Sequence, residues 1–195
     1  DRLVIEREGQ SLTLRIDGIV STGGAEEQQV FVNLPVAQQF LGLKYGVDRV
    51  PAIIIAAPGR DRIRYYGAPL GNELPTLLQA IGMAASGETA LTAHSRARLK
   101  ALSTPVALQV FFTPSCVYCP QMISLANQAA IESPLVTAVA IDATEFPDLV
   151  RRYNVNGVPK TIINDTMELM GAAPEDAFVA AITGDGDGDG DGDRD

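Results

Sequence analysis

The sequence predicts an α/β protein made of two tandem units, each a mixed central sheet flanked by helices. Three observations carry this prediction. The chain's only two cysteines, Cys116 and Cys119, follow a strand-like run and open a helix-like segment. Pro159 stands at the start of a β-branched run, where proline is unusual because it interrupts a sheet ladder. The surroundings of Pro159 are then repeated around Pro51, in the first half of the chain.

The cysteine pair lies between an apolar run at 106–112 and a segment with helical character at 117–131. The turn at 113–115 connects them. A thiolate is the nucleophile in disulfide chemistry, and the unpaired N–H groups of a helix's first turn stabilise an anion. The spacing therefore predicts that Cys116 is the exposed nucleophile. Cys119, one turn later and more buried, would resolve the mixed disulfide.

Three other uses of two cysteines compete with a redox pair. A zinc site needs about four ligands, whereas the chain offers these two thiols and one distant histidine, His94. A purely structural disulfide would close a very short loop and stabilise little. Two unrelated buried thiols are the third alternative. The strand–turn–helix context favours the redox pair over all three.

The Cys-x-x-Cys helix and the Val-Pro strand at 156–163 together resemble the thioredoxin superfamily. The resemblance implies that Pro159 is a cis-proline and that Val158 faces the active disulfide and hydrogen-bonds the substrate backbone. It also implies that the first cysteine of the pair is the nucleophile and the second the resolving cysteine. We expect Tyr118 and Pro114 to belong to the same substrate-binding surface.

The remaining elements of the second unit follow in chain order. They are a strand at 135–141, a helix at 146–153, a short edge strand at 167–170 and a last helix at 175–182. A further helix at 89–102 joins the units or opens the second, and places His94 on the surface. Lys160, at the start of a strand, is expected to be solvated.

The first half of the chain repeats the second without a gap around the Val-Pro motif. The matched pairs are 45–55 with 153–163, 29–34 with 137–142, and, with a length change, 66–69 with 170–174. This repeat predicts a Cys-less unit at 1–87 and a redox-active unit at 88–183. A disordered Gly-Asp tail at 184–195 follows.

The first unit differs from the second where the cysteines would stand. Alternating apolar and polar residues at 3–7 and 12–16, around a turn at 8–10, predict a hairpin or successive strands. A loop follows at 21–24. The first unit is therefore expected to be degenerate or incomplete and to take no part in dithiol chemistry.

Longer segments narrow the resemblance to proteins with two tandem folds of this kind. The segments at 46–52, 64–74, 112–120 and 153–160 are similar to the protein disulfide oxidoreductases, also called glutaredoxin-like proteins. They are also similar to the N-terminal domain of the alkyl hydroperoxide reductase flavoprotein. The resemblance implies a thiol–disulfide oxidoreductase acting on protein disulfides, or a dedicated electron relay to a peroxiredoxin. It also implies an upstream flavoprotein like thioredoxin reductase.

Two departures limit what this resemblance implies. Thioredoxins keep a buried aspartate where this chain has Val110, so the resolving cysteine must lose its proton by another route. The Gly-Gly-Asp element that helps glutaredoxins hold glutathione is replaced by Asn164-Asp165-Thr166, which argues against dependence on glutathione.

Composition agrees with a two-domain α/β protein in which hydrophobic residues make up 46% of the 195 positions. The net charge is −9, over half of it in the tail, and argues against nucleic-acid binding. No apolar run is long enough to span a membrane. We expect no cofactor beyond the disulfide, no metal, and, from the cysteine usage, a cytoplasmic location. A non-catalytic binding module remains the alternative from another class.

Overall fold

The computed structural model describes residues 2–7, 10–15, 47–57 and 60–184. These residues fall into two compact units, Asp1–Pro51 and Ala52–Asp195. The loop predicted at 21–24, the repeat match at 29–34 and the tail after Gly184 lie outside the described residues.

Two strands of the first unit form an antiparallel hairpin. β1 (Arg2–Arg7) pairs with β2 (Gln10–Arg15) in a register that sets Ile5 opposite Leu12. This confirms the pairing predicted from the alternating residues, while the turn between the strands lies outside the described residues. Further along the same unit, the peptide bond between Val50 and Pro51 is cis.

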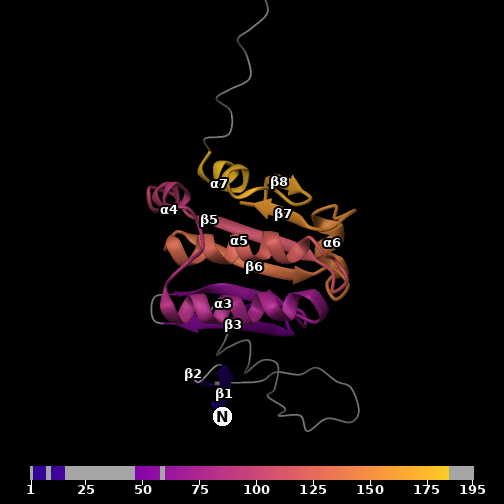
Figure 1. Cartoon of the computed structure of the whole chain (residues 1–195). Coiled ribbons are helices and arrows are strands. Elements are labelled where there is room, and N and C mark those ends of the chain that lie inside the picture. Colours follow the sequence, from indigo (N-terminus) through magenta and orange to yellow (C-terminus); the bar gives the residue numbers. More distant parts are fainter. Residues whose placement is uncertain (1, 8–9, 16–46, 58–59, 185–195) are drawn as a thin grey trace, which may run out of the picture. The chain divides into compact units, whose positions relative to one another are not determined.

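The second unit is built on one mixed, six-stranded sheet in the order β3-β4-β6-β5-β7-β8 (Figure 1). Its strands are β3 (Ala52–Ala57), β4 (Arg60–Tyr66), β5 (Val106–Phe112), β6 (Val136–Asp142), β7 (Lys160–Ile163) and β8 (Met167–Met170). β6 is parallel to both of its neighbours, β4 and β5, and the remaining pairs are antiparallel. β3 and β8 are the edges, as predicted for the strand at 167–170.

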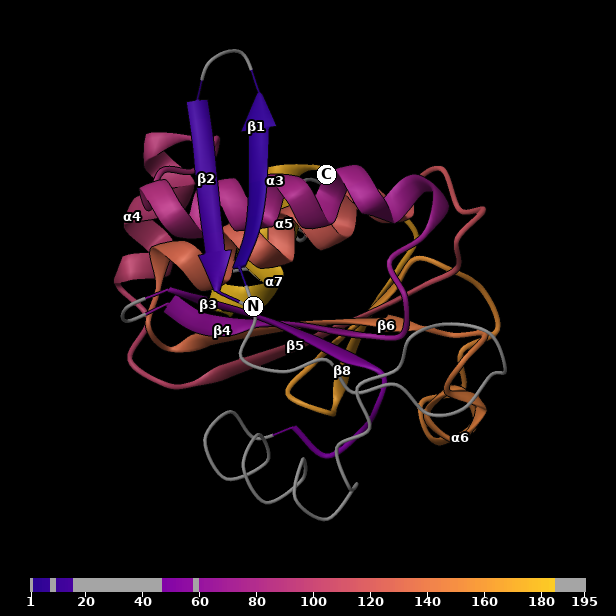
Figure 2. The same cartoon turned by 90° about the horizontal axis from the view of Figure 1, so that it is seen from below.

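Helices cover both faces of this sheet. They are α3 (Leu74–Ser86), α4 (Ala93–Lys100), α5 (Cys119–Glu132), α6 (Pro147–Arg152) and α7 (Glu175–Thr183), with a 3-10 turn η2 (Gly71–Glu73) before α3. Figures 1 and 2 show α3, α5 and α7 on one face and α6 on the other. The helices predicted at 117–131, 146–153 and 175–182 begin and end within two residues of α5, α6 and α7. α4 is shorter than the predicted 89–102.

α5 is the central helix of its layer and is buried around most of its circumference. It packs against α3 on one side, α4 on another and the sheet beneath. Small residues such as Ala126 and Ala129, both almost fully buried, let the neighbouring helices approach closely. β5 lies under this helix, and its Leu108, Val110 and Phe112 are buried in the same core cluster. The cysteine pair is thus attached to a strand and a helix whose side chains are buried in the core.

One order of elements occurs twice in the chain. A cis Val-Pro bond, an antiparallel hairpin and a helix follow one another as β3, β4 and α3 after Pro51, and as β7, β8 and α7 after Pro159. Each hairpin ends in a glycine with positive φ, Gly67 (93°) and Gly171 (75°). The helices likewise end at Gly87 and Gly184, both left-handed.

The sheet continues across residue 87, the predicted boundary between the repeated units. β4 lies before this boundary and pairs in parallel with β6, which lies after it. This pairing removes two exposed strand edges at once. The compact units divide instead at Pro51. The division into 1–87 and 88–183 stays a prediction about the repeat.

Candidate functional site

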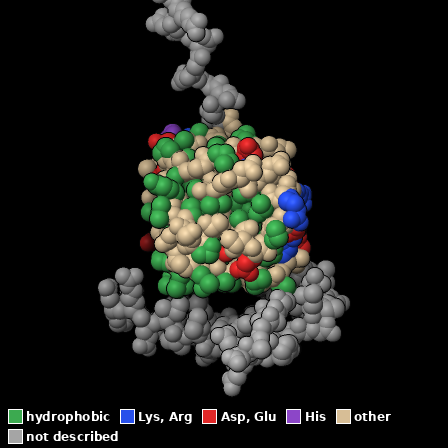
Figure 3. Space-filling model, turned by 90° about the vertical axis from the view of Figure 1, so that its right-hand side faces the viewer, with side chains coloured by type: hydrophobic (Ala, Val, Ile, Leu, Met, Phe, Trp, Pro, Cys, Tyr) green, Lys and Arg blue, Asp and Glu red, His purple; other side chains and the backbone are tan. Residues whose placement is uncertain are grey.

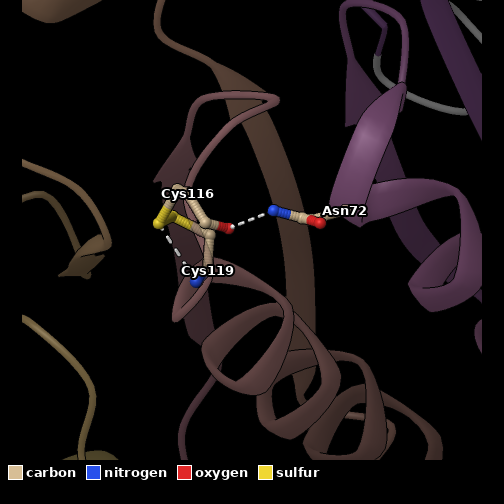
Figure 4. The surroundings of a disulfide bond; sticks show 3 residues. All are labelled: Asn72, Cys116 and Cys119. Atoms are coloured by element: carbon tan, nitrogen blue, oxygen red, sulfur yellow. Dashed lines mark hydrogen bonds between the residues drawn. A yellow bond between two sulfur atoms is a disulfide. The ribbon is translucent and has the colours of Figure 1, made fainter.

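Cys116 and Cys119 form a disulfide in the turn between β5 and α5 (Figure 4). Their Cα atoms are 5.5 Å apart. The N–H of Cys116 donates to the carbonyl of Thr113 at 3.0 Å, which closes the turn after the strand. α5 begins at Cys119 with Pro120 in its first turn, where an N–H would have no intrahelical partner. Cys116 therefore precedes the helix instead of standing in its first turn.

The two sulfur atoms lie in different surroundings. Cys119 is fully buried, whereas Cys116 is half-buried and is flanked by the exposed side chains of Val117 and Tyr118. The N–H of Cys119 donates to Cys116 Sγ at 3.1 Å. A donor at the start of a helix stabilises negative charge on that sulfur when the disulfide opens. The arrangement is suited to attack by Cys116 and to resolution by Cys119.

The 3-10 turn η2 contacts the segment 113–119, which contains both cysteines and is called the redox turn below. Sequence reasoning did not predict this contact. Asn72 Nδ2 donates to the Cys116 carbonyl at 3.3 Å (Figure 4), and the Asn72 N–H donates to the Pro114 carbonyl at 3.3 Å. Gly71, with φ of 60°, lies so close that an added Cβ would be 2.5 Å from Pro114 O. The signal was present in the segment 64–74, which carried part of the resemblance, but no single residue pointed to a role.

Glu73, in the same turn, is a buried acid that the sequence did not single out. Its side chain is fully buried, and neither carboxyl oxygen has a hydrogen bond of good geometry to any described residue. Burial raises the pKa of Glu73 to about 7, and the nearby Thr76 side chain offsets this only in part. η2 packs against α5, the helix that Cys119 opens. Val110, where thioredoxins keep an aspartate, is buried and apolar.

The predicted substrate-facing residues come from two segments of the chain, 114–118 and 158–159. Val158, in a cis bond with Pro159, is half-buried and packs against the same core cluster as Cys116. Pro159 is buried, and its carbonyl accepts from the Gly171 N–H at 2.8 Å. Tyr118 is 64% exposed. Cys116 and Val158 therefore pack against one core. The contact of Val158, Pro159, Tyr118 and Pro114 with substrate stays a prediction.

The prediction of a solvated Lys160 is wrong. This side chain is buried, and its Nζ donates to the carbonyls of Tyr153 and Asn154 and forms an ion pair with Glu168 at 2.6 Å. Lys160 therefore ties β7 to β8 and to the end of α6, and is a structural residue. His94 is exposed on α4, as expected.

The redox turn is a surface site. A cavity of about 460 Å³ lies at the other end of β5, between Arg98, Asn164 and Thr183, and includes neither cysteine. Within the described ranges, no group of three or more His, Cys, Asp or Glu side chains is placed to hold a metal ion. Of the helices that the structure describes, none has the length and apolar character needed to cross a membrane.

Known proteins share both the sequence pattern and the architecture. Residues 106–184 match the thioredoxin domain family. Thioredoxin of Methanocaldococcus jannaschii is 32% identical over 78 residues, which are 40% of this chain and 92% of that protein. The alkyl hydroperoxide reductase protein AhpF of Xanthomonas campestris pv. phaseoli is 27% identical over 136 residues, which are 69% of this chain. The match covers 26% of that relative, so the chain spans about a quarter of its length.

A solved structure extends the similarity beyond the thioredoxin domain. The crystal structure of a protein disulfide oxidoreductase from Aeropyrum pernix K1 aligns with a TM-score of 0.69 and 28% identity. The alignment covers 75% of this chain and 64% of that chain. This share of the chain exceeds residues 106–184, so the similarity also takes in part of what precedes β5.

Proposed function

Because the chain belongs to the thioredoxin family, we propose that it is a thiol–disulfide oxidoreductase that acts on protein disulfides through Cys116 and Cys119. The observation that carries this proposal is the asymmetric pair at the start of α5. Cys116 is accessible and accepts the Cys119 N–H, whereas Cys119 is enclosed. Attack on a substrate disulfide needs an accessible sulfur, here Cys116. Resolution of the mixed disulfide is then left to the enclosed sulfur of Cys119.

The reaction balances with the protein's own thiols as the two-electron donor. In the reduced protein, the Cys116 thiolate attacks one sulfur of a substrate disulfide, and the other sulfur leaves as a thiolate. The Cys119 thiolate then attacks Cys116 Sγ, which re-forms the protein disulfide and releases the second substrate thiolate. Two protons from the cysteines end on the substrate thiols. No cofactor is required beyond the cysteine pair.

We propose that Glu73 takes the proton of Cys119, because η2, which ends at Glu73, packs against α5, the helix that begins at Cys119. A general base works best when its pKa is near the working pH, and burial raises the pKa of Glu73 to about 7. Glu73 would replace the acid missing at Val110. We expect its carboxylate to receive the Cys119 proton during resolution and to return it to solvent afterwards.

The substrate is expected to lie across an apolar surface around Cys116. Val117 is 71% exposed and Tyr118 64%, while Pro114, Val158 and Pro159 complete the proposed binding residues. Figure 3 views the side of the molecule at which α6 lies in Figure 1. Hydrophobic and uncharged atoms fill much of this face, with Lys and Arg gathered along one edge. The exposed side chains of Val117 and Tyr118 beside Cys116 suit an extended, largely apolar protein segment.

We further propose that the chain is a tandem duplication whose first unit is degenerate. The repeated hairpin, helix and positive-φ glycines support this, as does the ungapped sequence repeat. The similarity to AhpF of alkyl hydroperoxide reductase favours a second candidate within the same class, a dedicated relay to a peroxiredoxin. A flavoprotein reductase would then supply the electrons.

The test is turnover followed by covalent trapping. Reduction of insulin disulfides is expected in the wild-type protein and is expected to be lost in Cys116→Ser. Cys119→Ser should instead accumulate mixed disulfides on Cys116 in a cell lysate, many for a general oxidoreductase and one dominant peroxiredoxin band for a relay. An unchanged insulin rate in Cys116→Ser would contradict the assignment of the nucleophile. No reducible adducts and no turnover would favour the non-catalytic binding module.

A further inference from the structure

Asn72, which lies outside the strand and helix of the redox turn, makes two hydrogen bonds to that turn. Asn72 donates twice, from Nδ2 to the Cys116 carbonyl (Figure 4) and from its backbone N–H to the Pro114 carbonyl. Both acceptors belong to the four-residue turn that Cys116 closes. Asn72 itself comes from η2, more than forty residues earlier in the chain.

The close approach of the two turns depends on Gly71. Its φ of 60° is in the left-handed region, and a side chain there would meet Pro114 O at 2.5 Å. Backbone therefore packs directly on backbone at this point. The contact sets the carbonyls of Pro114 and Cys116 within hydrogen-bond distance of donors of Asn72.

The orientation of the Cys116 carbonyl bears on its sulfur. Carbonyl and sulfur are attached to the same Cα, and Cys116 Sγ accepts the Cys119 N–H at 3.1 Å. A rotation of the Cys116 peptide would move Sγ relative to that donor. Hydrogen bonds prefer angles above about 150° and weaken steeply below about 120°, so a rotation that bends this bond reduces the stabilisation of a thiolate.

We propose that Asn72 is a positioning residue for the nucleophile: it fixes the Cys116 peptide so that Sγ stays aligned with the Cys119 N–H. The proposal rests on the proposed role of Cys116 as the attacking thiol. It gives the Cys-less half of the chain a part in the chemistry, because η2 lies in that half. Asn72 acts through Cys116 and is not assigned a contact with substrate.

A purely structural bridge is the competing account, and the chain contains a matched example. Ser124 Oγ of α5 donates to Gln79 Oε1 of α3 at 3.0 Å, between the same two halves but remote from the disulfide. Asn72 and Gln79 are both exposed and both belong to the η2–α3 segment. Removing either bridge should cost similar stability, but only Asn72 should alter the thiol.

The experiment measures the pH dependence of Cys116 alkylation by iodoacetamide in the reduced full-length protein. In Asn72→Ala the midpoint is expected to rise by about half to one pH unit, the range that one neutral hydrogen bond corresponds to. Asn72→Asp should raise it further, because a carboxylate offers no donor and repels the thiolate. Gln79→Ala should leave it unchanged.

A second pair of variants tests the close approach itself. Gly71→Ala should also raise the midpoint by displacing the turn, whereas Gly82→Ala should not, because an added Cβ at that exposed helical position meets nothing within 4 Å. Thermal unfolding of every variant verifies folding. The comparison of Gly71→Ala with Gly82→Ala tests the proposal in proteins that keep the Asn72 side chain.

The proposal is overturned if Asn72→Ala and Asn72→Asp keep the wild-type midpoint, or if Gln79→Ala shifts it equally. Its failure is distinct from failure of the proposed function. A wild-type protein that reduces no insulin would contradict the function while leaving the alkylation midpoints readable. Normal turnover with unshifted midpoints would contradict only the role of Asn72.

Discussion

At the scale of single residues, two buried charged side chains have opposite surroundings. Lys160 has two carbonyls and a carboxylate within reach of its ammonium group. Glu73 has no hydrogen bond of good geometry to a described residue, and its carboxylate form is penalised by burial. The first side chain stabilises the fold where it lies. The second has a pKa raised by burial, a property that is common among residues that act in chemistry.

Glu73→Gln should change how stability depends on pH. The folded protein binds the Glu73 proton more tightly than the unfolded chain, so stability is highest at low pH and declines as pH rises from 4.5 to about 7. The variant lacks this decline. It should exceed the wild type at pH 8 by on the order of 3 kcal/mol and differ little at pH 4.

Urea unfolding of the oxidised protein at both pH values checks this expectation. The exposed Glu88, changed to Gln, serves as the control. Parallel pH dependences in the Glu73 variant and the wild type would show that this carboxyl is not perturbed by burial.

At the scale of elements, the joint between the repeated segments is the parallel pairing of β4 with β6. Gly67 follows β4 directly and adopts φ of 93°. An added Cβ would be 2.6 Å from Asp142 Cβ, at the end of β6. Asp142 is itself fixed, because its Oδ1 accepts from Thr144 N at 2.8 Å. The close approach of the two strand ends therefore depends on a glycine.

Gly67→Ala should destabilise the protein by about 1–3 kcal/mol, since it combines a strained φ with a clash against a rigid partner. Gly82→Ala, in the exposed part of α3, should stabilise it by up to about 1 kcal/mol, because alanine is the better helix former. The two midpoints of urea unfolding provide the measurement. Equal effects at both glycines would refute the role given to the Gly67 turn.

At the scale of the whole molecule, the second compact unit contains every group proposed for the chemistry. Both cysteines, η2 and the six-stranded sheet lie within Ala52–Asp195, and so does the core cluster that surrounds Cys119. A chain of residues 52–195 should therefore fold with a reducible disulfide. Circular dichroism and titration of thiols after mild reduction would measure this. A fragment without a cooperative thermal transition would show that the core needs the preceding unit.

The sequence by itself determined the local elements and the redox pair. The strands at 106–112 and 167–170 have the predicted bounds. The signals that predict them, a strand-length apolar run and a turn at each end, come from residues that are neighbours in the sequence. The cysteines form the predicted pair because they lie three positions apart along a single turn. Such features depend on residues close together in the chain.

Only the tertiary structure decided which distant residues meet the redox turn. Asn72 comes from a segment with no pattern that specifies a partner, and β4 pairs across the predicted unit boundary. The burial of Lys160 likewise depends on carbonyls at the end of α6. Strand order and helix packing bring these groups together, and both arise from burying apolar faces over the whole unit. No window of neighbouring residues contains that information.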